Sequence, residues 1–573
     1  MKDDKLKAST GREKFFSRRV VGARAGKRQL MLVACLIASL LFAACQQEKA
    51  KKDVAGLTED KTNSNSTTTT ANVAMEATPN ASTSTMAYDD GLSPSSNTES
   101  YTHFDDNPFI EAARAPLSTF SIDVDTASYS NTRRFITDGQ LPPKDAVRIE
   151  ELVNYFTYDY PQPVGEAPFS VTAEVSEAPW NKAHRLVHIG LQGKRIAPEQ
   201  MPPANLVFLV DVSGSMNEPR KLPLLKSALK MMVEQLSARD RVAIVVYAGE
   251  SGLALPSTSG DRKSEILAAL DRLEAGGSTN GGAGIELAYQ LAQQNFIKGG
   301  ANRVILATDG DFNVGTTSEG ELVRLIEEKR EGGVFLSVLG FGTGNVKDST
   351  MEKLADKGNG NYAYIDTLME ARKALGEQIG GTLFTIAKDV KIQVEFNPKQ
   401  VAAYRLIGYE NRLLRDQDFN DDTKDAGEIG AGHTVTALYE VVPYGQRFDT
   451  AGVDALKYQQ PAQASEMADS RELMNIKLRY KEPDASFSKL LNIGLADAGN
   501  KLQSASENFK FASAVAEFGM LLRASKYKAD ASYTDVLQLA RSATGTDLHG
   551  YRNDFLKLVD KARALSSQRA ALD

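Results

Sequence analysis

The sequence predicts an α/β protein in which a doubly wound, mainly parallel sheet is flanked by a β-rich, sandwich-like domain and a C-terminal helical segment. Three observations lead to this fold class. Between residues 204 and 380, short apolar segments alternate with helical patterns, which favours a parallel sheet with helices on both faces. Both flanks of that region alternate with period two, which is typical of half-buried strands. After residue 485, apolar residues recur at helical spacing.

Residues 1–45 have the features of a lipoprotein signal peptide. An uncharged apolar run over residues 30–44 follows a group of basic residues, as in a secretory signal, and it is shorter than the ~20 residues of a membrane-spanning helix. Its end, Leu41-Phe42-Ala43-Ala44-Cys45, resembles a bacterial lipobox and implies lipidation of Cys45. By resemblance to lipoprotein sorting in Gram-negative bacteria, the presence of Gln46 in place of Asp after the cysteine implies the outer membrane of the cell envelope. A signal peptide with an incidental cysteine is the alternative.

Charge and cysteine content limit the function of the remaining chain. Residues 1–44 hold ten Lys or Arg and three Asp or Glu, a net charge of +7. Because the whole chain has a net charge of −7, the remaining residues carry −14. An acidic body argues against nucleic-acid binding. The two cysteines, Cys35 and Cys45, both lie near the N-terminus. The body therefore has no disulfide, cysteine-based zinc site or thiol nucleophile.

Residues 46–110 are expected to form a disordered, Ser/Thr-rich tether, because they hold few large apolar residues. Residues 111–203 form an N-terminal extension. We expect a strand over 119–124, a helix over 146–156, and paired strands over 169–175 and 186–191.

Residues 204–380 are expected to form the α/β domain. Five short apolar segments predict strands buried on both faces, and two amphipathic segments, 222–236 and 285–296, predict helices between them. The expected strands are Leu206–Val210, Val242–Tyr247, Val304–Ala307, Phe335–Leu339 and Tyr362–Ile365.

The region after the α/β domain divides into two parts. Residues 381–484 are β-rich, with expected strands over 390–396, 433–442 and 474–480. Residues 485–573 form the C-terminal helical region. Because similar strands precede the α/β domain, we expect that domain to be inserted into a sandwich built from both flanks. Separate packing of the two flanks would contradict this hypothesis.

Oxygen-bearing side chains follow the strands of the α/β domain. Asp211 ends the first strand, and Ser213 and Ser215 follow on a turn that Gly214 allows. Ligands of open α/β sheets bind at the carboxyl ends of strands. Asp309 directly follows another strand, and Thr279 lies in a glycine-rich loop before a helix. These side chains are therefore expected to face one crevice.

The set Asp211-x-Ser213-x-Ser215, Thr279 and Asp309 resembles the metal-ion-dependent adhesion site (MIDAS) of von Willebrand factor type A domains. The resemblance covers about residues 204–380. It implies a bound Mg²⁺, with Mn²⁺ or Ca²⁺ as alternatives, and a protein ligand whose acidic residue completes the metal coordination. Mg²⁺ prefers oxygen ligands. A degenerate site that binds no metal is the alternative.

A wider resemblance extends over nearly everything after residue 110. Residues 118–129 and 141–143 are similar to the N-terminal extension of YfbK-type bacterial lipoproteins, and residues 430–440 and 511–522 are similar to their C-terminal extension. This resemblance supports the architecture more than any particular activity.

The sequence favours a metal-dependent protein-binding or scaffolding module anchored by lipid to the cell envelope. No Gly-x-Ser-x-Gly elbow, Walker loop or His-Glu-x-x-His motif is present, so we expect no enzyme. Two other functions stay open: a Mg²⁺-dependent subunit of an enzyme-assembly machine, and a structural envelope protein with a vestigial metal site. The oligomeric state, the partner, and whether the domains face the periplasm or the cell surface are left undecided.

Overall fold

A six-stranded sheet forms the centre of residues 204–383 in the computed structural model, which describes residues 99–571 except 250, 278–280, 311–318, 345 and 449–463. Its strand order is β10-β9-β8-β5-β6-β7, and every pairing is parallel except that of β6 with β7. The strands are β5 (Ala204–Asp211), β6 (Arg241–Tyr247), β7 (Ser251–Ser259), β8 (Ala301–Thr308), β9 (Phe335–Phe341) and β10 (Tyr362–Ile365). The mainly parallel sheet is confirmed, and β7 is an antiparallel edge strand that the sequence did not reveal.

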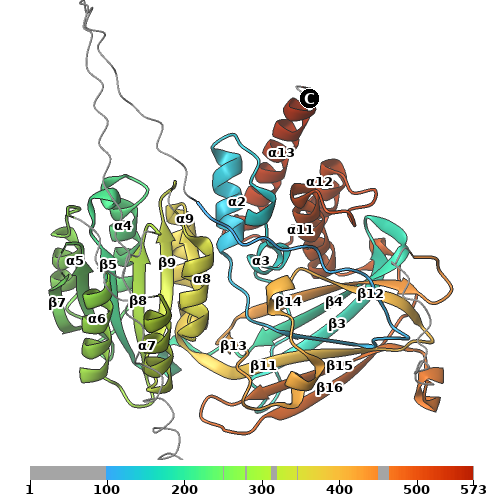
Figure 1. The fold of residues 1–573 in the computed structure, drawn as a ribbon, viewed down its shortest axis with the longest axis horizontal. Helices are drawn as coiled ribbons and strands as arrows, with labels where there is room; N and C mark the ends of the chain where they lie inside the picture. Colours follow the sequence, from blue (N-terminus) through green and yellow to red (C-terminus); the bar gives the residue numbers. More distant parts are fainter. Residues whose placement is uncertain are drawn as a thin grey trace, which may run out of the picture. The chain divides into compact units, whose positions relative to one another are not determined.

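Helices cover both faces of this sheet (Figure 1). Alternate residues of β5 enter two separate apolar clusters: Leu206 and Phe208 pack on one face, and Val207 and Leu209 on the other. This alternation explains why the strand is apolar at every position. The helices are α4 (Leu222–Val233), α5 (Lys263–Asp271), α6 (Gly282–Gln294), α7 (Glu319–Glu331), α8 (Asp348–Lys357), α9 (Leu368–Arg372) and α10 (Ile379–Leu383).

Strands from both sides of the α/β domain build one β-sandwich. The first sheet has the order β1-β12-β14-β4-β3, and the second has β13-β11-β15-β16 with β2 paired to β11. Strand β4 from the N-terminal flank pairs antiparallel with β14 from the C-terminal flank, so the expected insertion is confirmed. The strands are β1 (Ile110–Glu111), β2 (Leu117–Ser121), β3 (Phe169–Ala178), β4 (Asn181–Gly193), β11 (Thr385–Phe396), β12 (Val401–Ile407), β13 (Gly427–Gly430), β14 (Thr434–Pro443), β15 (Glu472–Lys481) and β16 (Lys489–Ala496).

The N-terminal extension begins earlier than expected. Asn107 donates hydrogen bonds to the backbone oxygens of Leu406 and Gly408, and β1 pairs with β12. The described residues 99–110 are therefore packed against the fold and do not belong to a tether. Strand β2 ends at Ser121, before the expected Val124, and is followed by α2 (Ala127–Thr137) and α3 (Ile149–Asn154).

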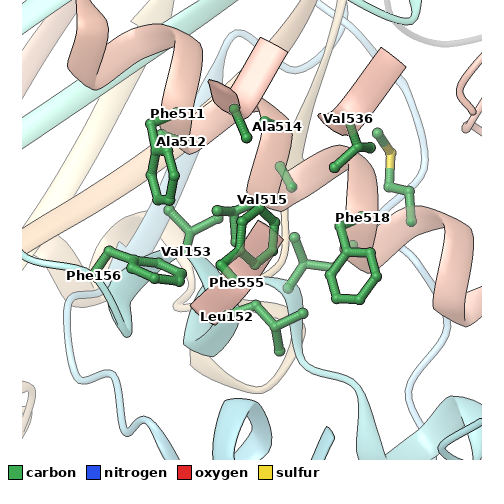
Figure 2. Close-up of a cluster of buried hydrophobic side chains, with 14 of the residues drawn as sticks. Leu152, Val153, Phe156, Phe511, Ala512, Ala514, Val515, Phe518, Val536 and Phe555 are labelled. Carbon is green, nitrogen blue, oxygen red and sulfur yellow. The ribbon is translucent and has the colours of Figure 1, made fainter. Parts of the chain in front are cut away.

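The C-terminal helices pack on one another and on α2 and α3, and together these helices form a further apolar core (Figure 2). They are α11 (Glu507–Arg523), α12 (Tyr533–Arg541) and α13 (Tyr551–Ala570). Ser506 and Ser532 cap α11 and α12 by accepting backbone hydrogen bonds, which satisfies N–H groups that the helix leaves unpaired. Phe511, Phe518 and Phe555 meet in edge-to-face contacts. The expected helical region from residue 485 is wrong at its start, because β16 occupies residues 489–496.

Buried arginines join the α/β domain to its flanks. Arg148 contacts Asp348 at 2.5 Å and Glu352 at 2.6 Å, both on α8. Arg133 of α2 pairs with Asp366 and with Glu370 of α9. Buried charges are unfavourable without an opposite charge beside them, so these ion pairs favour one orientation of the inserted domain.

None of the helices in the described part of the chain has the length and apolar character of a membrane-spanning helix.

Candidate metal centre

The carboxyl ends of three adjacent strands converge on Asp211. This residue ends β5, the strand between β6 and β8, and it is fully buried. Tyr247 at the end of β6 and Thr308 at the end of β8 each donate a side-chain hydrogen bond of 3.2 Å to its Oδ2 atom. Sequence reasoning missed both residues, although each is the last residue of a strand beside β5. The carboxylate is thereby held in one orientation before any ligand arrives.

The turn after β5 brings two hydroxyls beside this carboxylate. The Ser213 N–H donates to Asp211 Oδ1 at 2.9 Å, and the Ser213 and Ser215 Oγ atoms lie 3.1 Å apart. Ser213 is buried, whereas Ser215 is exposed. The Asp-x-Ser-x-Ser segment thus presents three neighbouring oxygen-bearing side chains from a single tight turn.

The glycine-rich loop is fastened to the same turn. The Gly276 N–H donates to the Val212 oxygen at 2.7 Å, and the Gly214 N–H donates to the Gly277 oxygen at 3.1 Å. Gly277 has a φ of +85°, a conformation that glycine adopts readily. Thr279 itself lies outside the described residues, as does Asp311.

Asp309 supplies the second carboxylate. It follows β8 directly and is fully buried. Its charge helps to raise the pKa of Asp211, although the larger cause is burial of the Asp211 carboxylate. Burial and mutual repulsion make the charged state of the two acids less favourable, and a bound cation would offset that cost.

A lysine that the sequence did not indicate also belongs to this centre. Lys221, just before α4, is buried and places its Nζ atom 3.0 Å from Asp309 Oδ2. The stem of this side chain lies against Gly342, where an added Cβ would come within 2.3 Å of Lys221 Cε. The glycine therefore makes room for the lysine. One positive charge of the protein already faces one of the two carboxylates.

The donor set fits a hard divalent cation. Asp211, Ser213, Ser215 and Asp309 offer carboxylate and hydroxyl oxygens, the ligands that Mg²⁺ prefers. No group of three or more His, Cys, Asp or Glu side chains suited to a metal occurs among the described residues. The described donors comprise two carboxylates and two hydroxyls. Such a set would leave part of the charge of a divalent cation uncompensated.

Family models match three successive parts of the chain. The model "von Willebrand factor" matches residues 95–188, and "von Willebrand factor type A domain" matches residues 205–378. The model "Uncharacterized protein YfbK, C-terminal" matches residues 381–565. These three matches together span the described residues almost completely.

Similar proteins include one that covers most of the chain. YfbK of Escherichia coli (strain K12) is 46% identical over 475 residues, 81% of each chain. Inter-alpha-trypsin inhibitor heavy chain H4 of Homo sapiens is 32% identical over 169 residues, which is 28% of this chain and 18% of that protein. Among solved structures, a von Willebrand factor type A protein from Catenulispora acidiphila is 16% identical and covers 69% of this chain and 91% of its own, with a TM-score of 0.38.

Proposed function

Because this chain belongs to the YfbK family and contains its von Willebrand factor type A domain, we propose that it is a metal-dependent protein-binding module. The observation that carries the proposal is the pair of buried carboxylates, Asp211 and Asp309, at the ends of adjacent strands. Hydroxyls of Ser213 and Ser215 lie beside the first carboxylate. Together with Thr279, these residues would hold Mg²⁺, or Mn²⁺ or Ca²⁺ in its place.

A cation held by these residues would supply an electrophilic position that an acidic side chain of the partner protein could occupy. The residues of this chain do the rest: Tyr247 and Thr308 hold Asp211 in place, and Lys221 balances part of the charge of Asp309. We propose binding and not catalysis, because none of these residues is arranged as a nucleophile with an adjacent base.

We further propose that the chain is anchored in the cell envelope through lipidated Cys45, with the outer membrane as the membrane concerned. This residue and the apolar run before it lie outside the described residues, so the support is the lipobox-like sequence alone. A lipid anchor followed by a polar segment would hold the binding domain at a membrane surface.

A pull-down from envelope extract tests the binding function. The full-length chain serves as bait with Mg²⁺, with a chelator, and as the Asp211→Ala variant. Asp271→Ala, at the exposed end of α5, is the matched control. We expect a partner that is retained by the wild type and the control only with Mg²⁺. Equal retention under all conditions would show that the metal centre is not the recognition surface.

Calorimetric titration with Mg²⁺ separates the metal from the partner. Asp211→Ala should abolish Mg²⁺ binding, whereas Asp271→Ala should leave it unchanged. A wild-type chain that binds no Mg²⁺ would instead favour the structural envelope protein with a vestigial site. Metal-dependent turnover of a small molecule by the extract complex would favour the enzyme-assembly alternative.

A further inference from the structure

Strand β16 forms a long, open edge of the β-sandwich. Its backbone pairs with β15 on one side (Figure 1). On the other side, the described residues provide no backbone hydrogen bond to residues 489–496. The pairing with β15 is regular from Lys489 to Leu495, and the strand contains no proline. A row of unpaired N–H and C=O groups of this kind is a template for another strand.

The other sheet edges of the described structure are protected. Strands β1, β10 and β13 are short, and β7 contains Pro256 and two register shifts. Strand β3 is covered by the segment after β16, because Glu174 accepts two hydrogen bonds from Ser506 and Ser176 donates one to the Asn500 oxygen. These are usual ways of blocking edge-to-edge association. Strand β16 has eight residues and no proline, and its one register shift lies at its end, between Leu495 and Ala496.

Apolar side chains of β16 at the edge of the sandwich core are partly exposed to solvent. Leu491, Ile493 and Leu495 face inward but are only half-buried. Their neighbours on β15, which are Leu478, Ile476 and Met474, are fully buried. On the opposite face Leu490 is 53% exposed, and Phe487 just before the strand is 81% exposed. Covering this edge would therefore remove apolar surface from water.

We propose that β16 is the dimerisation edge of this protein and pairs antiparallel with β16 of a second copy across a two-fold axis. A C2 interface brings the same surface of both subunits together. Residues that face the core in one copy lie opposite core-facing residues of the other only when a residue of β16 lies on the axis, opposite its own copy. A shift by one residue would turn every side chain to the other face. Each sheet of the pair would then continue into the other.

Charge selects the register. With Ile493 on the axis, Leu491 lies opposite the partner's Leu495, and Lys489 lies opposite the partner's Asp497. Placing residue 492 or 494 on the axis would put Lys489 opposite an uncharged residue. The Lys489 side chain is 57% exposed and pairs with the exposed Glu482, and Asp497 is partly exposed beside Arg185. Both can therefore face an opposite charge on the second copy, which favours a cross-strand pair.

Sedimentation of the full-length chain in a mild detergent tests the proposal. The wild type should pass from monomer to dimer as its concentration rises through the micromolar range. Lys489→Asp and Asp497→Lys each place like charges opposite one another twice, so each should weaken dimerisation on the order of tenfold or more. Lys557→Asp, an equal charge reversal on the exposed face of α13, should dimerise like the wild type.

Mixing the two reversed variants gives the sharpest result. In a heterodimer, the acid of the Lys489→Asp chain faces the base of the Asp497→Lys chain, and the unchanged Lys489 and Asp497 face each other at the second contact. The mixture should therefore associate like the wild type although neither variant does so alone. A wild type that stays monomeric, single variants that dimerise normally, or a mixture without restored association would each overturn the proposal. If Asp497→Lys does not fold because Arg185 loses its partner, normal dimerisation of Lys489→Asp alone still overturns it.

Discussion

Replacing Lys221 with methionine tests how charge is balanced in the metal centre. The ammonium lies 3.0 Å from a carboxylate oxygen of Asp309, which corresponds to a gross attraction of about 5.5 kcal/mol at an effective dielectric constant of ~20. Both side chains are buried, and removing one partner of a buried ion pair typically costs about 3–5 kcal/mol. We therefore expect the metal-free Lys221→Met variant to lose stability of that order.

Mg²⁺ should reverse part of this loss. Without the lysine, the cation becomes the main positive charge near Asp309, so we expect Lys221→Met to bind Mg²⁺ more tightly than the wild type. Each tenfold gain in affinity returns about 1.4 kcal/mol at saturating metal. Gly342→Ala should act in the same direction, because its Cβ would collide with the lysine stem and its backbone has a φ of +79°.

Two measurements decide the outcome. Denaturant unfolding without metal and at several Mg²⁺ concentrations gives the stability, and calorimetry gives the affinity. Lys230→Met is the matched control, because Lys230 lies on α4, the helix that directly follows Lys221, and pairs with Asp271 at the exposed surface. If Lys221→Met is as stable as this control, or if its Mg²⁺ affinity falls, the lysine does not balance Asp309 in the way described.

Three further outcomes follow from buried charges. Asp211→Asn should weaken Mg²⁺ binding at least tenfold by calorimetry, since it removes one of the two carboxylates, and unchanged affinity would place the metal elsewhere. Arg148→Met should lower the unfolding free energy by about 3–5 kcal/mol, because it leaves Asp348 buried without its arginine. Arg563→Met, at an exposed pair, should cost less than about 1 kcal/mol, and equal losses would contradict the reasoning. Burial raises the pKa of Glu517 to about 8, so the folded state holds a proton that the unfolded state releases above pH ~4.5. The stabilisation from this proton is fully present below that pH and is lost by about pH 8. The unfolding free energy of Glu517→Gln, measured with denaturant, should therefore decline less steeply between about pH 5 and 8 than that of the wild type. Equal slopes for the two proteins would refute the assignment.

The positions of Asp211, Ser213, Ser215 and Asp309 in the fold were predictable because these residues follow strand ends. The run Leu206–Val210 is apolar at every position, as a strand between two helical layers must be, and the motif beginning at Asp211 directly follows it. Lys221 was not predictable. Its approach to Asp309 depends on where the start of α4 lies against Gly342, which no local pattern encodes.

The parts that sequence reasoning missed have weak local signals. Strand β7 contains Pro256 and several serines, so its alternation is poor. In β16, leucine and alanine outnumber the single β-branched residue, Ile493, and those residues are common in helices. The ion pairs of Arg148 join residues that are about 200 positions apart, so only the fold brings them together.

The insertion of the α/β domain has a consequence for how the chain folds. Strands β4 and β14 pair Gln192 with Thr434, residues 242 positions apart. Contacts so distant in sequence form slowly, because the intervening loop must first be closed. A parallel sheet folded within residues 204–383 replaces most of that loop by a rigid body, with short links to β4 and β11. The sandwich is therefore expected to assemble faster once its insert has folded, and a substitution that delays the insert would keep both flanks exposed to aggregation during synthesis.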